Sequence, residues 1–179
     1  MSNRPQAPLT ADVIADRMAI VDTLNQHCRG LDRNDADLLK DCYWPEGSVD
    51  YGNFKGPAHT FTELVGPALS QTYELTRHSI SNTLLEFDGI LARAESYVQA
   101  GHLLTGGKQE MRFEGRYLDT LEKRGTQWRL IHRQVVMDWS CNSSITDERE
   151  SEAYTALAKG KAEKSDPLYP FLAGSVSHD

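Results

Sequence analysis

Residues 74–140 read ELTRHSISNTLLEFDGILARAESYVQAGHLLTGGKQEMRFEGRYLDTLEKRGTQWRLIHRQVVMDWS, and this segment determines the architecture. It is dense in Ile, Val, Leu, Thr, Tyr and Trp and contains no proline, as a multi-stranded sheet requires. Turn-forming pairs fall at Asp88-Gly89, Gly106-Gly107 and Arg124-Gly125, so that successive turns are 18 residues apart. The spacing predicts four strands of about 14–16 residues, well above the usual five or six.

Strands of this length cannot stay flat in a small domain, because fifteen residues would span about 50 Å. Gly101 and Gly115 lie inside the strand pattern, where glycine commonly marks a bulge or a bend. We therefore expect a strongly curved sheet. Counting across the turns pairs residue 78 with 99, 99 with 114 and 114 with 135, although a single bulge would reverse the faces.

The segment before the sheet is helical in pattern. Thr10 is a candidate N-cap, Asn34 or Asp35 can cap a short second helix, and Pro57 opens a third. Apolar residues at three- and four-residue steps mark the first helix: Ile14, Met18, Val21, Leu24, Cys28 and Leu31. Because helices precede strands, we expect an α+β fold in which a curved antiparallel sheet and N-terminal helices form a cone-shaped α+β barrel around a largely apolar cavity.

The chain is long enough for one domain with its own core. We expect a flexible arm at 1–9, the domain at 10–140, and a C-terminal extension at 141–179. The extension serves as a lid or a subunit contact, or its end is disordered. Ten of the twenty residues from 147 to 166 are charged, and their pattern predicts a short surface helix.

Composition narrows the function. The formal charge is −7, from 19 basic and 26 acidic residues, which argues against nucleic-acid or anionic-membrane partners. The three cysteines show no CxxC spacing, so no metal site is expected. The sequence contains no P-loop, Rossmann glycine pattern, GxSxG or HExxH motif, so we expect neither a nucleotide cofactor nor an esterase or zinc-protease site. Neither a signal peptide nor a membrane span is evident, and we expect a cytoplasmic protein.

Four polar residues stand among apolar ones: His27, Asp32, His78 and Arg133. His27 shares a helix face with leucines, Asp32 follows that helix, and His78 and Arg133 alternate with apolar residues in predicted strands. Each also has a structural interpretation. The histidines can be satisfied within the core, Asp32 can act as a cap or turn residue, and Arg133 can pair with a structural carboxylate.

Four segments carry a family resemblance: DTLNQHCRGLDRNDADLLKDCYWPEGSVDYG (22–52), FKGP (54–57), TRHSISNTLLEF (76–87) and QWRLIHRQVVMDWS (127–140). Over roughly residues 10–140 the chain resembles the SnoaL-like branch of the nuclear transport factor 2-like (cystatin-like) superfamily. Enzymes of that branch include hexachlorocyclohexane dehydrochlorinase, scytalone dehydratase and bile-acid dehydratase. The resemblance implies a catalytic dyad of Asp32, in Gly-Leu-Asp, and His78, in Thr-Arg-His. It also places His27 where these enzymes carry a donor, and Arg133 where the dehydrochlorinase has an arginine that assists the leaving group.

A His–Asp pair without a serine or cysteine is a general base. His27, Tyr51 and Arg133 would then stabilise negative charge on a leaving group or oxygen. The resemblance implies a lyase without cofactor or metal, which catalyses dehydration, dehydrohalogenation or deformylation as a homotrimer or homodimer. Seven candidate wall residues favour a hydrophobic aromatic or polycyclic substrate: Tyr43, Trp44, Tyr51, Phe54, Phe61, Met137 and Trp139.

Three alternatives stay open. The first is an isomerase or cyclase on the same scaffold, and the second is a non-catalytic ligand-binding domain. The third is a small subunit like the β subunit of ring-hydroxylating dioxygenases.

Overall fold

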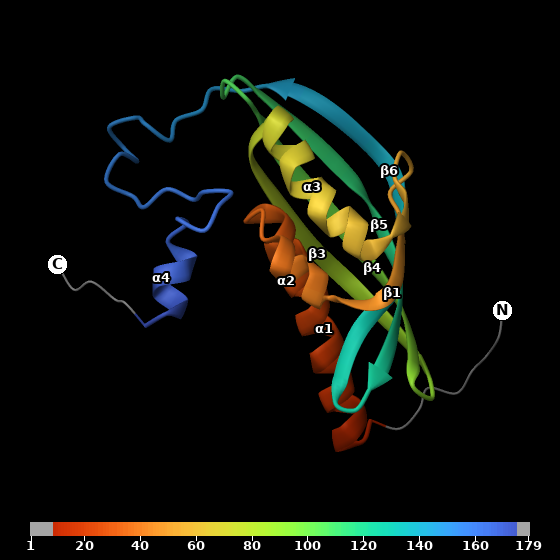
Figure 1. Ribbon diagram of the computed structural model, residues 1–179. Helices are drawn as coiled ribbons and strands as arrows, with labels where there is room; N and C mark the ends of the chain where they lie inside the picture. The colour runs from red at the N-terminus through yellow and green to blue at the C-terminus, as the bar shows by residue number, and fades with distance from the viewer. Residues whose placement is uncertain (1–8, 175–179) are drawn as a thin grey trace.

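The computed structural model describes residues 9–174 and has the predicted α+β architecture (Figure 1). Most of the predicted arm at 1–9 therefore lies outside the described residues. The elements are α1 (Ala11–Asp32), α2 (Ala36–Asp41), β1 (Tyr43–Asp50), β2 (Lys55–Pro57), α3 (Ala58–Thr72), β3 (Tyr73–Asp88), β4 (Leu91–Leu104), β5 (Gln109–Arg124), β6 (Gln127–Ser144) and α4 (Leu168–Leu172). The strands β3, β4, β5 and β6 contain 16, 14, 16 and 18 residues, which confirms the prediction of four long strands joined by three turns.

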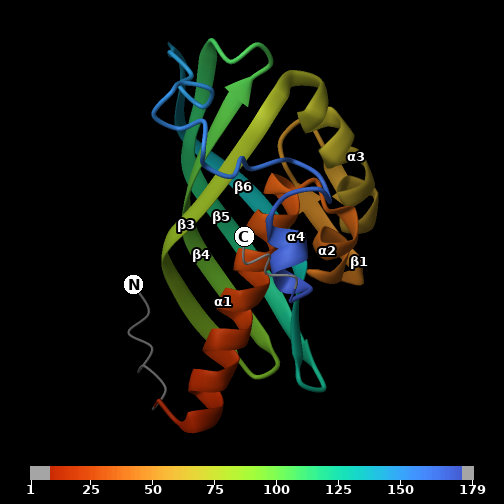
Figure 2. The same cartoon turned by 90° about the vertical axis from the view of Figure 1, so that its left-hand side faces the viewer.

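The strands form one curved, unclosed sheet in the order β2-β1-β6-β5-β4-β3. All neighbouring strands are antiparallel except β1 and β6, which run parallel. The helices α1, α2 and α3 lie along one side of the sheet, and α1 packs beside the edge strand β3 (Figures 1 and 2). The core between the layers is built from α1, α3 and the inward residues of the sheet, including Ile20, Leu24, Tyr43, Phe61 and Leu130.

The strand register differs from the counted one. Gln99 pairs with Glu114 as expected, but His78 pairs with Ala100, and Glu114 pairs with Trp139. The difference has two sources. The turns close with Asp88 opposite Leu91 and with Arg124 opposite Gln127, one residue later than the count assumed. Register shifts between Ser81 and Leu84, between Glu114 and Gly115, and between Thr120 and Leu121 then change the pairing further along the strands.

Of the two strand glycines, only Gly115 lies at a shift. A Cβ on Gly115 would lie 2.1 Å from the Val136 carbonyl oxygen, so this position next to the register shift requires glycine. Gly101 pairs regularly with Arg77 and Arg112, so it does not mark a bulge.

The end of α1 is fixed by a tight turn into α2. Thr10 caps the start of α1 by accepting from the Val13 amide at 3.3 Å, and Asp35 rather than Asn34 caps α2. A Cβ on Gly30 would lie 2.7 Å from Leu39 Cγ, so glycine allows the two helices to approach closely. Asp32 is the last residue of α1, and its side chain contacts His78 of β3.

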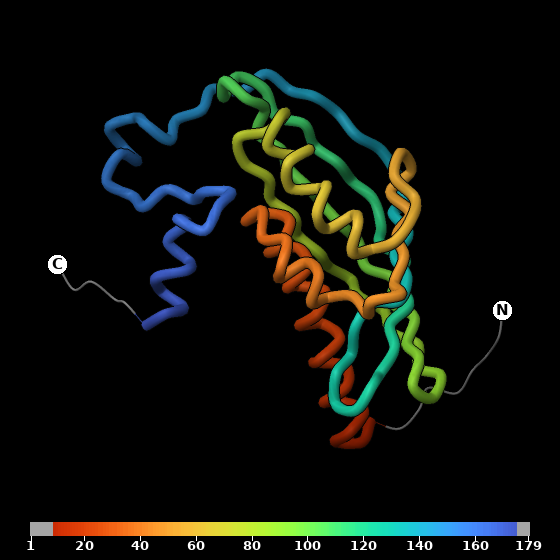
Figure 3. The backbone as a smooth tube through the Cα atoms, in the orientation of Figure 1, coloured from red at the N-terminus to blue at the C-terminus, as the bar shows by residue number. Residues whose placement is uncertain are grey.

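The C-terminal extension leaves the end of β6 and returns to the helices (Figures 2 and 3). The surface helix predicted within 147–166 is wrong. Isolated turns replace it, with i to i+3 hydrogen bonds such as Tyr154 N to Ser151 O, and the short helix α4 comes later. The predicted helix has few apolar residues to bury, and a short helix without a packed face is marginal in water. No helix in residues 9–174 is long and apolar enough to cross a membrane.

Candidate active site

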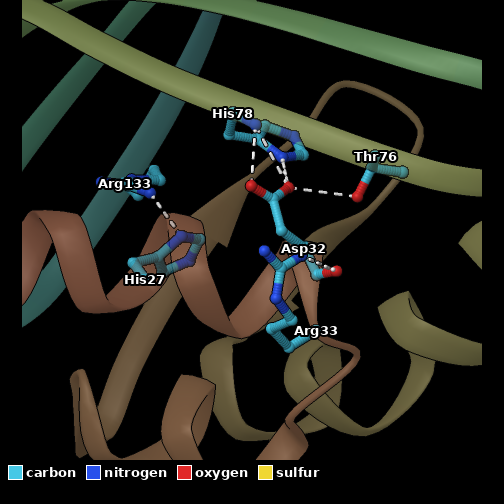
Figure 4. Close-up of polar contacts among 6 residues, drawn as sticks. All are labelled: His27, Asp32, Arg33, Thr76, His78 and Arg133. Atoms are coloured by element: carbon cyan, nitrogen blue, oxygen red, sulfur yellow. Dashed lines mark hydrogen bonds and ion pairs between the residues drawn. The ribbon is translucent and has the colours of Figure 1, made fainter. Parts of the chain in front are cut away.

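The side chains of His78 and Asp32 form a directly bonded pair between β3 and the end of α1 (Figure 4). His78 Nδ1 lies 2.6 Å from Asp32 Oδ1, and the His78 backbone amide donates to Oδ2 at 2.9 Å. The Thr76 hydroxyl donates to Oδ1 at 3.1 Å. A carboxylate held by these donors requires the proton of the neutral imidazole on Nδ1, which leaves Nε2 as the basic atom. We call this pair the dyad.

The dyad is mostly buried yet lines the wall of an open cleft. The His78 and Asp32 side chains are 8% and 12% exposed. The cleft has a volume of about 480 Å³, and we call it the dyad cleft; its walls come from α1, β3 and α4. The lining residues are Asn25, Cys28, Arg29, Asp32, Arg33, His78, Ser79, Ile80 and Leu168.

The dyad cleft is more polar than the apolar cavity expected from the sequence. The seven aromatic or soft residues proposed as its wall are absent from its lining. Tyr43 and Phe61 are buried in the core, with Tyr51 and Phe54 packed against it, whereas Met137 is exposed on the outer half of β6. The large aromatic residues therefore give no direct measure of the substrate.

His27 and Arg133 belong to a buried network behind the dyad. Arg133 donates through Nε and Nη2 to both Asp119 carboxylate oxygens at 2.7 Å, and through Nη1 to His27 Nδ1 at 2.9 Å. His27 Nε2 in turn lies 2.9 Å from Tyr43 Oη. His27 and Arg133 are fully buried. Burial and the charge of Arg133 hold the pKa of His27 well below its usual range, so the imidazole is neutral.

Tyr51, the third proposed charge-stabilising residue, stacks on Phe61 with ring centroids 4.3 Å apart. Its hydroxyl is buried and has no hydrogen-bond partner among the described residues, and burial raises its pKa to about 12. The structure thus brings His78 and Asp32 together, and His27 and Arg133 together. It leaves His27, Tyr51 and Arg133 outside the lining of the dyad cleft.

His102 is a residue that the sequence reasoning missed. It lies on β4 opposite Thr76, and its ring meets the His78 ring edge to face, with centroids 5.4 Å apart. It is 6% exposed, and burial, reinforced by the neighbouring His78, lowers its pKa to about 4. The sequence contains a signal for its inward position. Val98, Ala100 and His102 are alternate residues of one strand, so His102 shares the inward face of the two apolar residues.

A hollow that adjoins the dyad cleft also exposes Asp32 and His78, together with His102. Its outer side is formed by Ile145 and Gly160 from the C-terminal extension. Within residues 9–174, no three His, Cys, Asp or Glu side chains are arranged to hold a metal ion.

Comparison with known proteins gives a family and a fold. A family model described as a SnoaL-like domain matches residues 12–134. A protein of Novosphingobium aromaticivorans, provisionally named a scytalone dehydratase, is 21% identical with a TM-score of 0.69, over 77% of this chain and 94% of that one. The dehydrochlorinase LinA-type3 of Novosphingobium barchaimii is 20% identical with a TM-score of 0.66, over 75% and 93%.

A protein of unknown function with a cystatin-like fold, from Nostoc punctiforme, is 21% identical with a TM-score of 0.60, over 73% of this chain and 94% of that one. A search among curated proteins finds no match. At these identities the solved structures establish the shared fold.

Proposed function

Because the chain belongs to the SnoaL-like domain family, we propose that it is a cofactor-independent lyase in which His78 is the general base and Asp32 its partner. The observation that carries the proposal is the 2.6 Å contact between His78 Nδ1 and Asp32 Oδ1 at the wall of an open cleft. A neutral imidazole with its Nδ1 proton held by a carboxylate is suited to accept a proton at Nε2 near neutral pH.

The proposed reaction is an elimination on a small organic molecule, and the screen below tests the hydrophobic aromatic or polycyclic class expected from the sequence. His78 Nε2 takes a proton from a carbon atom, and the C–H electron pair becomes the new double bond. In dehydration or dehydrohalogenation, the bond to the hydroxyl or halide on the neighbouring carbon breaks, and that group leaves with its electron pair. In deformylation, His78 instead takes the proton of a hydroxymethyl O–H, and the O–H pair forms the C=O bond of formaldehyde. The C–C bond then breaks, and its pair forms the new double bond as a leaving group departs from the next carbon. Asp32 stabilises the imidazolium that forms, which then returns its proton to the leaving group or to water.

Two of the similar structures support the reaction class by name, since a dehydratase and a dehydrochlorinase both perform eliminations. Within the proposal, Arg133 and His27 support the wall behind the dyad, because neither residue lines the cleft and the charge of Arg133 is already paired with Asp119.

The test is a substrate screen with three proteins. Aryl ketones bearing a β-hydroxyl or a β-chloro group, and hydroxylated steroid-like compounds, are incubated with wild type, Asp32→Asn and His78→Ala, and products are identified by mass spectrometry. We expect wild type to release water or chloride, and both variants to lose at least about a hundredfold in rate. His132→Ala, a histidine bonded to Ser48 elsewhere on the sheet, is the matched control.

Turnover that survives both dyad substitutions within a few fold would show that the assignment is wrong. Products with the substrate's own mass would instead identify an isomerase or cyclase that uses the same base.

A further inference from the structure

We infer that residues 160–172 form a displaceable wall of the dyad cleft, and that Leu168 in this wall sets the size of the substrate that the cleft accepts. The part of this inference that concerns substrate rests on the proposed function. The segment lies beyond residues 12–134, which the family model matches, so it is an addition to the shared domain.

The segment reaches the dyad from two sides. Leu168, the first residue of α4, lines the dyad cleft together with Asp32 and His78. Gly160 lines the adjoining hollow, which contains the same two residues. Polar contacts with Arg33 and Asp35 tie this segment to the end of α1 and the start of α2, and in Figure 2 α4 lies in front of these helices. A molecule seated beside His78 in the dyad cleft therefore meets Leu168.

The first attachment of the segment fixes Leu168 directly. Asp166 is 3% exposed, and its carboxylate accepts from the Leu168 amide at 2.9 Å and from the Lys161 amide at 2.7 Å. The same carboxylate lies 3.4 Å from Nε of Arg33, the residue that follows Asp32. One buried carboxylate thus orients Leu168 and ties it to the end of α1.

The second attachment lies at Asp35, the N-cap of α2. Its carboxylate accepts from the Tyr169 hydroxyl at 2.8 Å and forms an ion pair with Lys164. Lys164 also lies over the Tyr169 ring, 4.8 Å from the centroid. We call the contacts of Lys164 and Tyr169 with Asp35 the latch.

The wall is held by polar contacts and buries little apolar surface. No residue of α4 is fully buried, and Phe171 and Leu172 are 67% and 59% exposed. Ion pairs at a partly exposed surface are weak, and segments with few buried apolar contacts open at low cost. The segment can therefore move aside for a substrate and return, with Leu168 closing on it.

The first experiment measures whether the latch closes the cleft, using the chain's own cysteines. Cys28 lines the dyad cleft and is 6% exposed, Cys42 is buried in the core, and Cys141 is exposed. The full chain is treated with N-ethylmaleimide, and the labelling rate of each cysteine is followed by peptide mass spectrometry. Cys141 reports the activity of the reagent, and Cys42 reports the integrity of the fold.

The latch variant is Lys164→Ala with Tyr169→Phe. Its matched control is Lys159→Ala with Tyr154→Phe, the same residue types elsewhere in the extension, where Lys159 Nζ donates to the Tyr154 backbone carbonyl oxygen. We expect Cys28 to react at least about tenfold faster in the latch variant and at the wild-type rate in the control, with Cys42 slow in all three. A Cys28 rate within twofold of wild type in the latch variant would overturn the closing role.

The second experiment measures size selection by titrating phenol and 2-naphthol into the protein with calorimetry. We expect Leu168→Trp to weaken 2-naphthol binding at least tenfold while phenol changes by less than about threefold, and Leu168→Ala to favour the larger probe. Leu172→Ala, one helical turn away and outside the cleft lining, should alter neither.

An unchanged ratio of the two affinities in both Leu168 variants would refute the role of Leu168. Neither measurement uses turnover, so failure of the elimination assay and failure of this inference can be told apart.

Discussion

His78 contacts Asp32 through two separate groups, its ring Nδ1 at 2.6 Å and its backbone amide at 2.9 Å. The second contact belongs to β3 itself and does not depend on the imidazole. The carboxylate therefore stays anchored to the strand when the ring is replaced, and variants of the His78 side chain test chemistry rather than the position of α1.

Replacing Asp32 by Asn should separate charge from shape at the dyad. The amide keeps the size of the side chain but cannot stabilise an imidazolium, and its NH₂ group competes with the donors that surround it. We expect kcat for the substrate identified in the screen to fall by about 10²–10⁴-fold. The control is Asp37→Asn on the exposed first turn of α2, and circular dichroism should show both proteins folded. A loss below threefold would contradict the role of Asp32.

Thr76→Val tests the support of the carboxylate by the neighbouring hydroxyl. Thr76 is buried and donates to Asp32 Oδ1 at 3.1 Å, so the isosteric change removes one donor to a charged group. A hydrogen bond of this kind contributes about 1.5–3 kcal/mol, and we expect roughly a tenfold fall in kcat with KM little changed. Thr83→Val on the same strand, whose hydroxyl contacts Ser96, should leave kcat at the wild-type value. Equal effects in the two variants would mean that the hydroxyl has only a general structural role.

Removing one partner of the buried ion pair between Arg133 and Asp119 should destabilise the protein more than removing an arginine from a surface ion pair. Both residues are buried, and Arg133→Met leaves the Asp119 carboxylate without its bidentate partner. We expect the free energy of unfolding in urea to fall by about 3–5 kcal/mol. Arg116→Met removes an arginine with two acidic partners at the surface, Glu95 and Asp138, and should leave the free energy of unfolding close to the wild-type value.

The double variant Arg133→Met with Asp119→Leu should recover most of the loss, because no charge is left buried alone. If the double variant is less stable than Arg133→Met, the pair stabilises the fold through more than charge compensation.

The sequence predicts the large features of the fold because they depend on local chemistry. Asp88-Gly89, Gly106-Gly107 and Arg124-Gly125 specify three turns, and their even spacing fixes the strand lengths. The alignment of Gly30-Leu31-Asp32 and Thr76-Arg77-His78 with the family pattern leads to two side chains that the structure joins.

Features that depend on strand register and tertiary packing could not be predicted from the sequence. The shift between Ser81 and Leu84 offsets β3 against β4 by one residue, which conceals that His102 lies opposite Thr76. The buried position of Arg133 depends on Asp119, which contacts it through β5–β6 pairing and has no sequence signal of its own. Likewise, attachment of the C-terminal extension depends on tertiary contacts with Arg33 and Asp35.

His102 should make the protein less stable in mild acid. Burial lowers its pKa from 6.5 to about 4, so between these pH values the unfolded chain binds a proton that the folded chain does not. The free energy of unfolding therefore falls as pH decreases from 6.5 to 4, by at most about 3 kcal/mol from this residue. In His102→Phe this contribution is absent, and stability should fall less steeply over the same window.

The control for this last prediction is Tyr73→Phe, which alters the ring packed 4.7 Å from His102 without removing an imidazole. His27, whose pKa is also lowered, contributes to the acid response of all three proteins alike. Urea unfolding at several pH values and NMR titration of the His102 ring provide the two measurements. Parallel stability curves for wild type and His102→Phe, or titration of His102 near pH 6.5, would show that the ring is hydrated and that its contact with His78 does not exclude water.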